Sequence, residues 1–540
     1  MPSWLNDAVF YEIYPQSFKD TNGDGIGDIE GIIRSLDYIK SLGMNALWLN
    51  PCFDSPFKDA GYDVRDYKKV APRYGTNDDL VRLFDEAHKR GMHVLLDLVA
   101  GHSSEEHEWF KMSSRQAPNE YSGRYIWTSF CFEGMAAAGY NFIAGESERS
   151  GSYIVNFFKC QPALNYGFLK PTAEWQDSID SENALATREA LKDIMRFWMD
   201  KGCDGFRVDM AASLVKNDDE KKTGTSAIWH DIRAMMDADY PECALLAEWS
   251  DPRISIPAGF HMDFLLNNPG EPYPTLLRDY MNHTDNAIKI LAGSGFNGDG
   301  RPMPAYEDHS FFKKDAGGDI RRFLDGYLEM LNDTNGQGYI SIISCNHDTV
   351  RPSYTLETRE LKLFYDFLYT MPGIPFLYYG DEIGMRYLNI PTREGGYFRT
   401  GSRTPMQWAH GKNLGFSTAD PDELYLPVDP SSDAPTVESA VADPASLYAE
   451  IRTMAGIRHR EDALKAKNNL EVLFAEGPVF IYRRGNVLLG LNTASAPFTY
   501  QLHDKIASCK AGILHQTGDA HFDNESVTLG SQSFLALKLS

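Results

Sequence analysis

The sequence predicts an α/β protein: a (β/α)8 TIM barrel with a small domain inserted after the third strand and a C-terminal antiparallel β-sandwich. Two observations support this prediction. First, a unit recurs along the chain, in which an amphipathic helix is followed by a glycine and a short apolar strand. Second, three such strands end in a carboxylate, at Asp209, Glu248 and Asp348. In barrels of this kind, chemistry collects at the carboxyl ends of the strands.

The recurring unit is well represented near the start of the chain. Apolar residues at helical spacing in 29–36 lead through Gly43 to an apolar strand. Such a glycine suits the left-handed residue that ends a helix. Strands that are apolar on both faces and alternate with helices indicate a parallel sheet covered by helices. Eight strands are expected: Val9–Tyr14, Asn45–Leu49, Met92–Val99, Gly205–Asp209, Cys243–Ala247, Phe260–Leu266, Tyr339–Ser344 and Ile374–Tyr379.

Two regions interrupt this alternation. Residues 103–170 are rich in aromatic residues, Ser, Gly and Asn, and are too long for an ordinary connection between strand and helix. From about residue 460 the helical pattern fades, and alternating apolar stretches predict an antiparallel sandwich. The predicted domains are therefore a barrel at 1–102 and 171–459, an inserted domain at 103–170 and a C-terminal domain at 460–540.

Composition narrows the class of protein. With 540 residues, 43% of them apolar, the chain can build a large core and more than one domain. The net charge of −24 argues against nucleic-acid binding. No apolar run is long enough to span a bilayer and no secretory signal is visible, so we expect a cytoplasmic protein without a membrane partner. The seven scattered cysteines show no metal-ligand spacing and are expected to be reduced. Oligomeric state is left open.

The three strand-end carboxylates suit the hydrolysis of a glycosidic bond. That reaction needs one carboxylate that attacks or activates water and one carboxyl that donates a proton. Arg207 lies on the same strand face as Asp209, and its charge is expected to keep Asp209 ionised. Glu248 follows four apolar residues, so desolvation is expected to raise its pKa and keep it protonated. Asp348, beside His347, is expected to accept hydrogen bonds from sugar hydroxyls.

Four segments in order resemble the signatures of the α-amylase superfamily, glycoside hydrolase family 13. They are Asp97–His102, Gly205–Asp209, Glu248 and Asn346–Asp348. The resemblance implies that Asp209 is the nucleophile, Glu248 the acid/base, and Asp348 the residue that distorts the substrate and stabilises the transition state. It also implies that Arg207, His102 and His347 contact the same bound sugar.

Within that family, the chain is most similar to the oligo-1,6-glucosidase and α-glucosidase branch. The segments that resemble it are Asp59–Asp63, Gln161–Asn165 and Ser402–Trp408. In that branch an Asp–Arg pair closes the pocket around the glucose at the non-reducing end, and the resemblance places this pair at Asp59 and Arg403. It also implies that Tyr62 supplies an aromatic face for the sugar ring.

Three positions depart from the family pattern. Gly101 stands where the family usually carries Asn, and Ala163 stands where it usually carries Asp. Met210, just after the predicted nucleophile, is neither the Val associated with α-1,6 linkages nor the Ala or Thr associated with α-1,4 linkages. The linkage preference is therefore left open.

A loop after the first strand carries oxygen ligands at the spacing of the first half of an EF-hand. The resemblance places a calcium or magnesium loop at the same point. We expect a structural Ca²⁺ or Mg²⁺ ion here, held by Asp20, Asn22, Asp24, Asp28 and the carbonyl of Ile26.

The leading functional hypothesis is a retaining exo-acting α-glucosidase whose partner is a short α-glucoside. The first alternative is an α-glucosyl transferase or isomerase, of the type that forms trehalose or isomaltulose, with the same nucleophile. The second is an endo-acting α-amylase, against which the Asp59–Arg403 pair argues. A non-enzymatic member of the superfamily is a third class, disfavoured because all three carboxylates are present.

Overall fold

Eight parallel strands close into a barrel in the computed structural model, which describes residues 1–133, 139–266, 271–281, 308–392, 394, 397–502, 510–523 and 525–540. Their order around the barrel is β1-β12-β11-β10-β9-β8-β5-β2. Each lies within its predicted range, so the predicted barrel is confirmed. The strands are β1 (Phe10–Ile13), β2 (Ala46–Leu49), β5 (His93–Val99), β8 (Gly205–Asp209), β9 (Ala244–Ala247), β10 (Met262–Phe264), β11 (Tyr339–Ile343) and β12 (Ile374–Tyr378).

The barrel strands are buried on both faces, which explains their continuous apolar runs. Every residue of β8 and β9 is buried. Their register pairs Gly205 with Ala244 and Val208 with Ala247. Gly205 has a φ of +132°, and a Cβ there would lie 2.0 Å from the carbonyl oxygen of Ala244. Only glycine allows this close approach at the start of β8.

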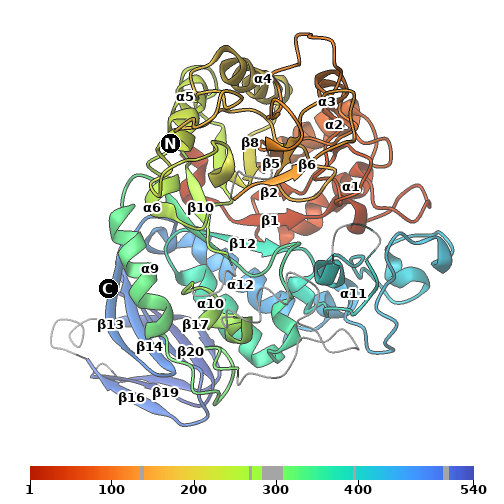
Figure 1. Cartoon of the computed structure of the whole chain (residues 1–540). Coiled ribbons are helices and arrows are strands. Elements are labelled where there is room, and N and C mark those ends of the chain that lie inside the picture. The colour runs from red at the N-terminus through yellow and green to blue at the C-terminus, as the bar shows by residue number, and fades with distance from the viewer. Residues whose placement is uncertain are drawn as a thin grey trace.

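Helices surround the barrel (Figure 1). Several begin with side-chain caps: Asp28 accepts a hydrogen bond from the backbone of Gly31, and Thr76 forms a capping box with Asp79. The α-helices are α1 (Ile29–Ser41), α2 (Asn77–Lys89), α3 (Glu108–Ser113), α4 (Glu182–Met199), α5 (Thr223–Asp239), α6 (Pro252–Ser255), α7 (Pro274–Leu277), α9 (Arg321–Asp333), α10 (Thr358–Thr370), α11 (Val437–Ala442) and α12 (Leu447–Arg460).

Residues 103–170 leave the carboxyl end of β5 and return to it. They contain α3 and a two-stranded sheet of β6 (Asn141–Ile143) and β7 (Tyr153–Val155). An antiparallel bridge joins His102 to Ala163, so both ends of the segment lie at the mouth of the barrel. A second small sheet, of β3 (Phe53–Asp54) and β4 (Asp66–Val70), follows β2.

The C-terminal part forms two antiparallel sheets that pack face to face, which confirms the predicted sandwich. Apolar side chains from both sheets, including Ile481, Leu488, Val527 and Leu529, share one buried cluster. One sheet has the order β13 (Leu470–Glu476), β14 (Val479–Arg484), β15 (Val487–Asn492), β20 (Ser533–Leu539) and β17 (Ala511–Thr517); the other has β16 (Phe498–Gln501), β19 (Ser526–Leu529) and β18 (Ala520–Phe522).

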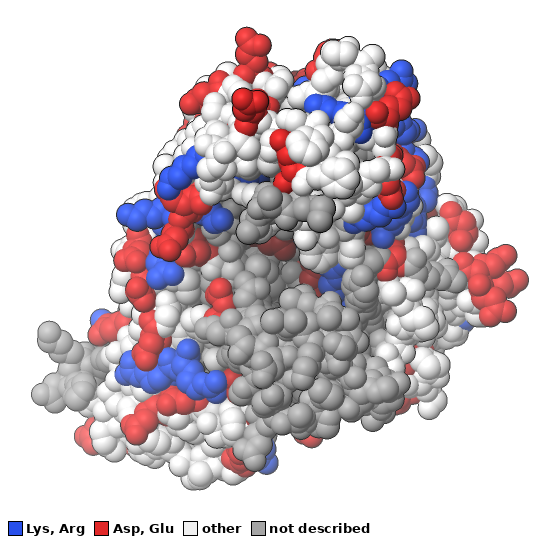
Figure 2. Space-filling view, in the orientation of Figure 1, with Lys and Arg blue, Asp and Glu red and all other residues white. Residues whose placement is uncertain are grey.

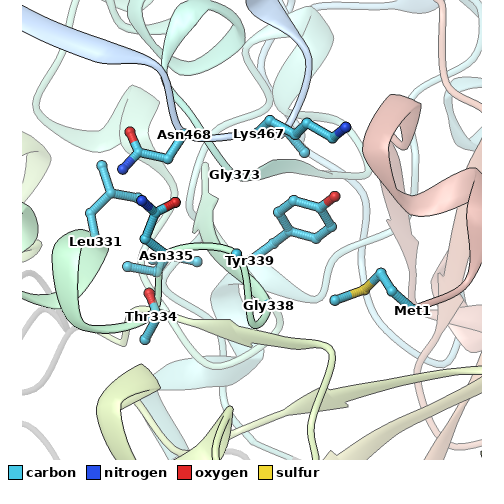
Figure 3. A pocket seen from close by; sticks show the side chains of 12 residues that line it. Met1, Leu331, Thr334, Asn335, Gly338, Tyr339, Gly373, Lys467 and Asn468 are labelled. Carbon is cyan, nitrogen blue, oxygen red and sulfur yellow. The ribbon is translucent and has the colours of Figure 1, made fainter.

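A cavity of about 340 Å³ lies at the amino ends of the barrel strands, where Tyr339 begins β11 and Gly373 precedes β12 (Figure 3). Met1 and Lys467 also line it. This is the end of the barrel opposite the strand-end carboxylates, so the cavity is separate from the predicted site.

The surface carries charges of both signs. On the face drawn in Figure 2, acidic and basic side chains are interspersed. Among the helices of the described residues, none combines the length and apolar composition that a membrane span requires. Six of the seven cysteines lie in the described residues as unpaired thiols, and Cys509 lies outside them.

Candidate active site

Arg207 joins three carboxylates at the centre of the barrel mouth. Its guanidinium is fully buried, with Nη1 2.7 Å from Asp97 Oδ1 and 3.2 Å from Asp209 Oδ1. Nη2 lies 2.8 Å from Glu248 Oε2. These four side chains come from the adjacent strands β5 and β8 and from the residue after β9. The predicted proximity of Asp209, Glu248 and Arg207 is therefore observed, and Asp97 joins them.

Glu248 is also held by the backbone that follows Asp209. The N–H of Met210 donates a 2.8 Å hydrogen bond to Glu248 Oε2. Met210 adopts a left-handed conformation, with φ +45° and ψ 43°, which turns this N–H toward the carboxylate. Such a backbone is costly for a residue with a side chain, and it is the kind of strain found at functional sites.

The electrostatics of Asp209 differ from the expectation. Burial and the neighbouring charge of Glu248 raise the pKa of the Asp209 carboxyl well above its usual range, and the charge of Arg207 only partly opposes them. Arg207 is shared with Asp97 and Glu248, so its charge offsets the burial of Asp209 only in part.

Tyr62 and His347 form a second group beside these carboxylates. The Tyr62 hydroxyl donates to Asp97 Oδ2 at 3.0 Å and lies 2.6 Å from His347 Nε2. His347 Nδ1 lies 2.9 Å from Glu12 Oε1. Burial disfavours the charged imidazole, but the carboxylates of Asp348 and Glu12 outweigh it and raise the pKa of His347. The predicted residues Tyr62 and His347 thus lie together, with rings stacked 5.3 Å apart.

Asp348 accepts from two arginines. Arg403 Nη2 lies 2.8 Å and Arg399 Nη1 2.9 Å from Asp348 Oδ1. Burial alone would raise the pKa of Asp348, but His347 and the two arginines hold it well below its usual range. Asp348 is therefore ionised in this site.

The predicted pair of Asp59 and Arg403 is not in direct contact in the structure. Arg399, not Arg403, faces Asp59, with Nη2 3.5 Å from Asp59 Oδ1. Arg403 is buried and donates to the backbone carbonyl of His347 at 2.9 Å, which turns it toward Asp348 instead. Asp59 is further held by Gln161 Nε2, 2.6 Å from its Oδ2. Arg399 therefore bridges Asp59 and Asp348. It lies four residues before Arg403, the position that sequence similarity indicated.

His102 lies at the edge of the same group. Its Nε2 is 3.1 Å from the carbonyl oxygen of Tyr62, and burial lowers its pKa to about 4, so the ring is neutral. The departure at Gly101 has a structural reason: a Cβ there would lie 2.6 Å from Asn156 Nδ2. Asn156 occupies the space that a side chain at position 101 would need, and Lys216 Nζ donates to its Oδ1 at 2.9 Å.

Sequence reasoning missed Asp97, Arg399, Glu12 and Asn50 as members of the site. Glu12 and Asn50 could have been predicted, because functional side chains collect at the carboxyl ends of barrel strands and these two lie at the carboxyl ends of β1 and β2. Asn50 Nδ2 lies 3.1 Å from Glu12 Oε1 and 3.0 Å from His347 Nδ1. Arg399 had no such signal, since it follows β12 by many residues in a long connection.

The predicted metal loop is folded by its own hydrogen bonds. Asp20 accepts from the backbone N–H groups of Asn22, Gly23 and Gly25. Asp28 accepts from Gly31 and Thr21. The donor set is the oxygen-rich kind that Ca²⁺ or Mg²⁺ takes.

The carboxylate oxygens of that loop lie farther apart than a bound ion requires. Among the described residues, the ligand atoms of Asp20, Asp24 and Asp28 do not all come within 4.8 Å of one another. The ligand types therefore suit Ca²⁺ or Mg²⁺, but the carboxylates must move closer together to bind an ion.

Comparison with known proteins identifies the family. Residues 12–260 and 312–467 match the model of the alpha amylase catalytic domain. The chain belongs to the alpha-amylase family. This confirms the resemblance seen in the sequence, and the chain is a glycoside hydrolase of the alpha-amylase family.

The relatives have several activities. The trehalose synthase/amylase TreS of Mycolicibacterium smegmatis is 32% identical, across 89% of this chain and 80% of its own length. An oligo-1,6-glucosidase of Heyndrickxia coagulans is 30% identical, across 96% of this chain and 97% of its own. The solved structure of trehalulose synthase MutB from Pseudomonas mesoacidophila shares the fold, with a TM-score of 0.78 at 24% identity over 100% of both chains.

Proposed function

We propose that this protein is a retaining exo-acting α-glucosidase that removes terminal α-linked glucose from short oligosaccharides. The observation that carries the proposal is the bridge formed by Arg399 between Asp59 and Asp348, beside the carboxylates around Arg207. A charged bridge in this place offers hydrogen bonds to the hydroxyls of a terminal sugar. It also obstructs a chain that continues past that sugar, which an endo-acting amylase would have to accommodate.

The proposed reaction uses the carboxylate pair in two steps. Asp209 attacks the anomeric carbon while Glu248 gives its proton to the departing glycosidic oxygen, and a covalent glycosyl-enzyme forms. Glu248 then takes a proton from the incoming water, whose oxygen replaces Asp209 on the sugar. Asp348, ionised between Arg399, Arg403 and His347, receives hydrogen bonds from sugar hydroxyls.

A second candidate is an α-glucosyl transferase or isomerase with the same glycosyl-enzyme. It is favoured by the 32% identity to a trehalose synthase/amylase and by the shared fold of a trehalulose synthase. The two candidates differ only in the acceptor of the second step, which is water in one and a sugar hydroxyl in the other.

The products separate the candidates. The enzyme is incubated with maltose, isomaltose, sucrose, trehalose and nigerose, and free glucose and new disaccharides are quantified by ion chromatography. The glucosidase proposal predicts free glucose as the main product from at least one disaccharide. If an isomeric disaccharide accumulates in its place, the chain is a transferase or isomerase.

We also propose that the loop of Asp20, Asn22, Asp24, Asp28 and the Ile26 carbonyl holds a structural Ca²⁺ or Mg²⁺ ion. The oxygen-rich donor set supports it, as does the buried position of Asp20 and Asp28. Bound metal would tighten a loop that connects β1 to α1 and would supply no step of the reaction. Calorimetric titration of the chelator-treated protein with Ca²⁺ tests this, and no binding in the millimolar range would refute it.

A further inference from the structure

Three side chains that commonly ligate metals meet between the barrel helices and the C-terminal sheet. Asp366 comes from α10, Glu450 from α12 and His515 from β17, and one ligand atom of each lies within 4.8 Å of the other two. Figure 1 shows α10 and α12 next to the C-terminal strands. His515 Nε2 is 3.7 Å from Asp366 Oδ1 and is hydrogen-bonded to Glu450 Oε1.

Hydrogen bonds within this cluster do not account for the burial of the Asp366 carboxylate. Its side chain is fully buried, and neither carboxylate oxygen makes a hydrogen bond of good geometry, although Thr517 and Glu450 lie beside it. Burying an unpaired carboxylate is costly, and native proteins pair such groups or use them as metal ligands. Burial, followed by the charge of Glu450, raises the pKa of Asp366 well above its usual range. The position therefore favours a cation that would balance both carboxylates.

The surroundings supply a neutral donor and one competing charge. Thr517 Oγ1 lies 3.0 Å from Glu450 Oε1 and 3.1 Å from His515 Nε2, so its hydroxyl lies next to the candidate ligand atoms. Lys362 Nζ is 3.5 Å from the other oxygen of Glu450, Oε2, and donates to the carbonyl of Ala445 at 2.7 Å. Lys362 thus pairs with Glu450, and its charge offsets the burial of Asp366 only in part.

We propose that Asp366, Glu450 and His515 form a structural site for a first-row divalent cation, with Zn²⁺ as the representative ion. One imidazole nitrogen and two carboxylates are a ligand set that Zn²⁺ accepts. Metal–ligand bonds of about 2.0–2.2 Å place tetrahedral ligand atoms roughly 3.3–3.6 Å apart, close to the His515–Asp366 separation. On binding, the proton between His515 and Glu450 leaves to solvent, because a ligating nitrogen must be deprotonated.

A metal ion bound at this site would connect the barrel domain to the C-terminal domain. Asp366 and Glu450 belong to helices of the barrel, whereas His515 belongs to the edge strand β17 of the C-terminal sheet. An ion bound by all three would join the two parts, and its binding energy would add to the stability of the folded protein.

The test is Zn²⁺ binding by the full-length protein. The chelator-treated protein is titrated with Zn²⁺ in excess Ca²⁺, which occupies hard-oxygen sites, and the stoichiometry and thermal midpoint are measured. The wild type is expected to bind one more equivalent of Zn²⁺ than His515→Gln and to gain thermal stability with it. Asp366→Asn is expected to lose the same equivalent, with affinity at this site reduced at least about tenfold.

His521→Gln is the matched control, because His521 lies on β18, the next strand along the chain, and pairs with Asp519 at an exposed position. It should keep both the extra equivalent and the thermal shift. Asp366→Asn removes a buried charge without changing shape, so it is expected to fold even if His515→Gln does not. If the wild type and Asp366→Asn bind equal amounts of Zn²⁺ with equal thermal shifts, the cluster is an ion pair only and the proposal is wrong.

Discussion

At the scale of single residues, the site is organised by one buried cation. Arg207 contacts Asp97, Asp209 and Glu248 at once, so its charge is divided among three carboxylates. This division leaves Asp209 with a raised pKa, which is a cost to the folded protein at neutral pH. Functional sites commonly carry such a cost.

Replacing that charge should stabilise the protein. A carboxyl whose folded pKa exceeds its unfolded value of about 3.9 destabilises the folded protein once the pH rises above that unfolded value, and this cost is present at pH 7. Asp209→Asn removes it, and we expect stabilisation of about 1 kcal/mol or more at pH 7, together with loss of activity. Calorimetry at pH 7 should show a higher thermal midpoint, and the gain should shrink toward pH 4. Asp325→Asn, at an exposed position, should show no such pH-dependent gain.

Arg399 should control recognition of the terminal sugar. Removing one charged hydrogen-bond donor to a substrate costs about 1.5–3 kcal/mol, so Arg399→Ala should lower kcat/KM for maltose about 10- to 100-fold. The ratio of activity on a malto-oligosaccharide blocked at its non-reducing end to that on the unblocked sugar should rise. Arg386→Ala, which removes a surface pair with Asp433, is the control and should change neither. An unchanged ratio in Arg399→Ala would contradict the proposed role of the bridge.

At the scale of elements, most of the fold could be predicted and part of the site could not. The glycine-and-strand unit predicted four barrel strands and their apolar runs predicted the other four, because burial on both faces leaves a strong apolar pattern. The strand ends placed Asp209, Glu248 and Asp348 together for the same reason. Arg399 was missed because a residue in a long connection has no register with the barrel. The pKa of Asp209 was missed because it depends on how many carboxylates share Arg207.

In the loop between β1 and α1, a close backbone contact requires glycine at position 25. Gly25 has a φ of +84°, and a Cβ there would lie 2.3 Å from the carbonyl oxygen of Glu423. Gly336 has a similar φ of +78° but open space around it. Gly25→Ala should therefore destabilise the protein by about 2–3 kcal/mol, against about 1 kcal/mol for Gly336→Ala, which carries the backbone strain alone. Urea denaturation measures both, and equal losses would show that the contact with Glu423 does not matter.

At the scale of the whole molecule, the sandwich is bound to the barrel by buried polar contacts as well as apolar ones. Arg484 of β14 is fully buried and donates to the carbonyls of Thr370, Lys465 and Lys467 at 2.7, 2.7 and 2.9 Å. Thr370 ends α10, so this arginine connects a barrel helix to the C-terminal sheet. Burial lowers the pKa of Arg484 to about 10, and it stays charged at neutral pH.

Removing this connection should be costly. Arg484→Ala leaves several buried carbonyls without a donor, and we expect a loss of about 3–5 kcal/mol in the free energy of unfolding. Its neighbour Arg483 pairs with Glu471 at the surface, so Arg483→Ala should cost no more than about 1 kcal/mol. Chemical denaturation compares the two, and similar losses for both variants would contradict the contribution assigned to Arg484.

The central claim is that Asp209 is the nucleophile of the carboxylate group around Arg207. Trapping the covalent intermediate tests it most directly: the enzyme is incubated with 5-fluoro-α-glucosyl fluoride, digested and analysed by mass spectrometry. A fluoroglucosyl adduct on Asp209 is the predicted result. An adduct on Glu248 or Asp348, or turnover of natural substrates by Asp209→Ala at the wild-type rate, would contradict it.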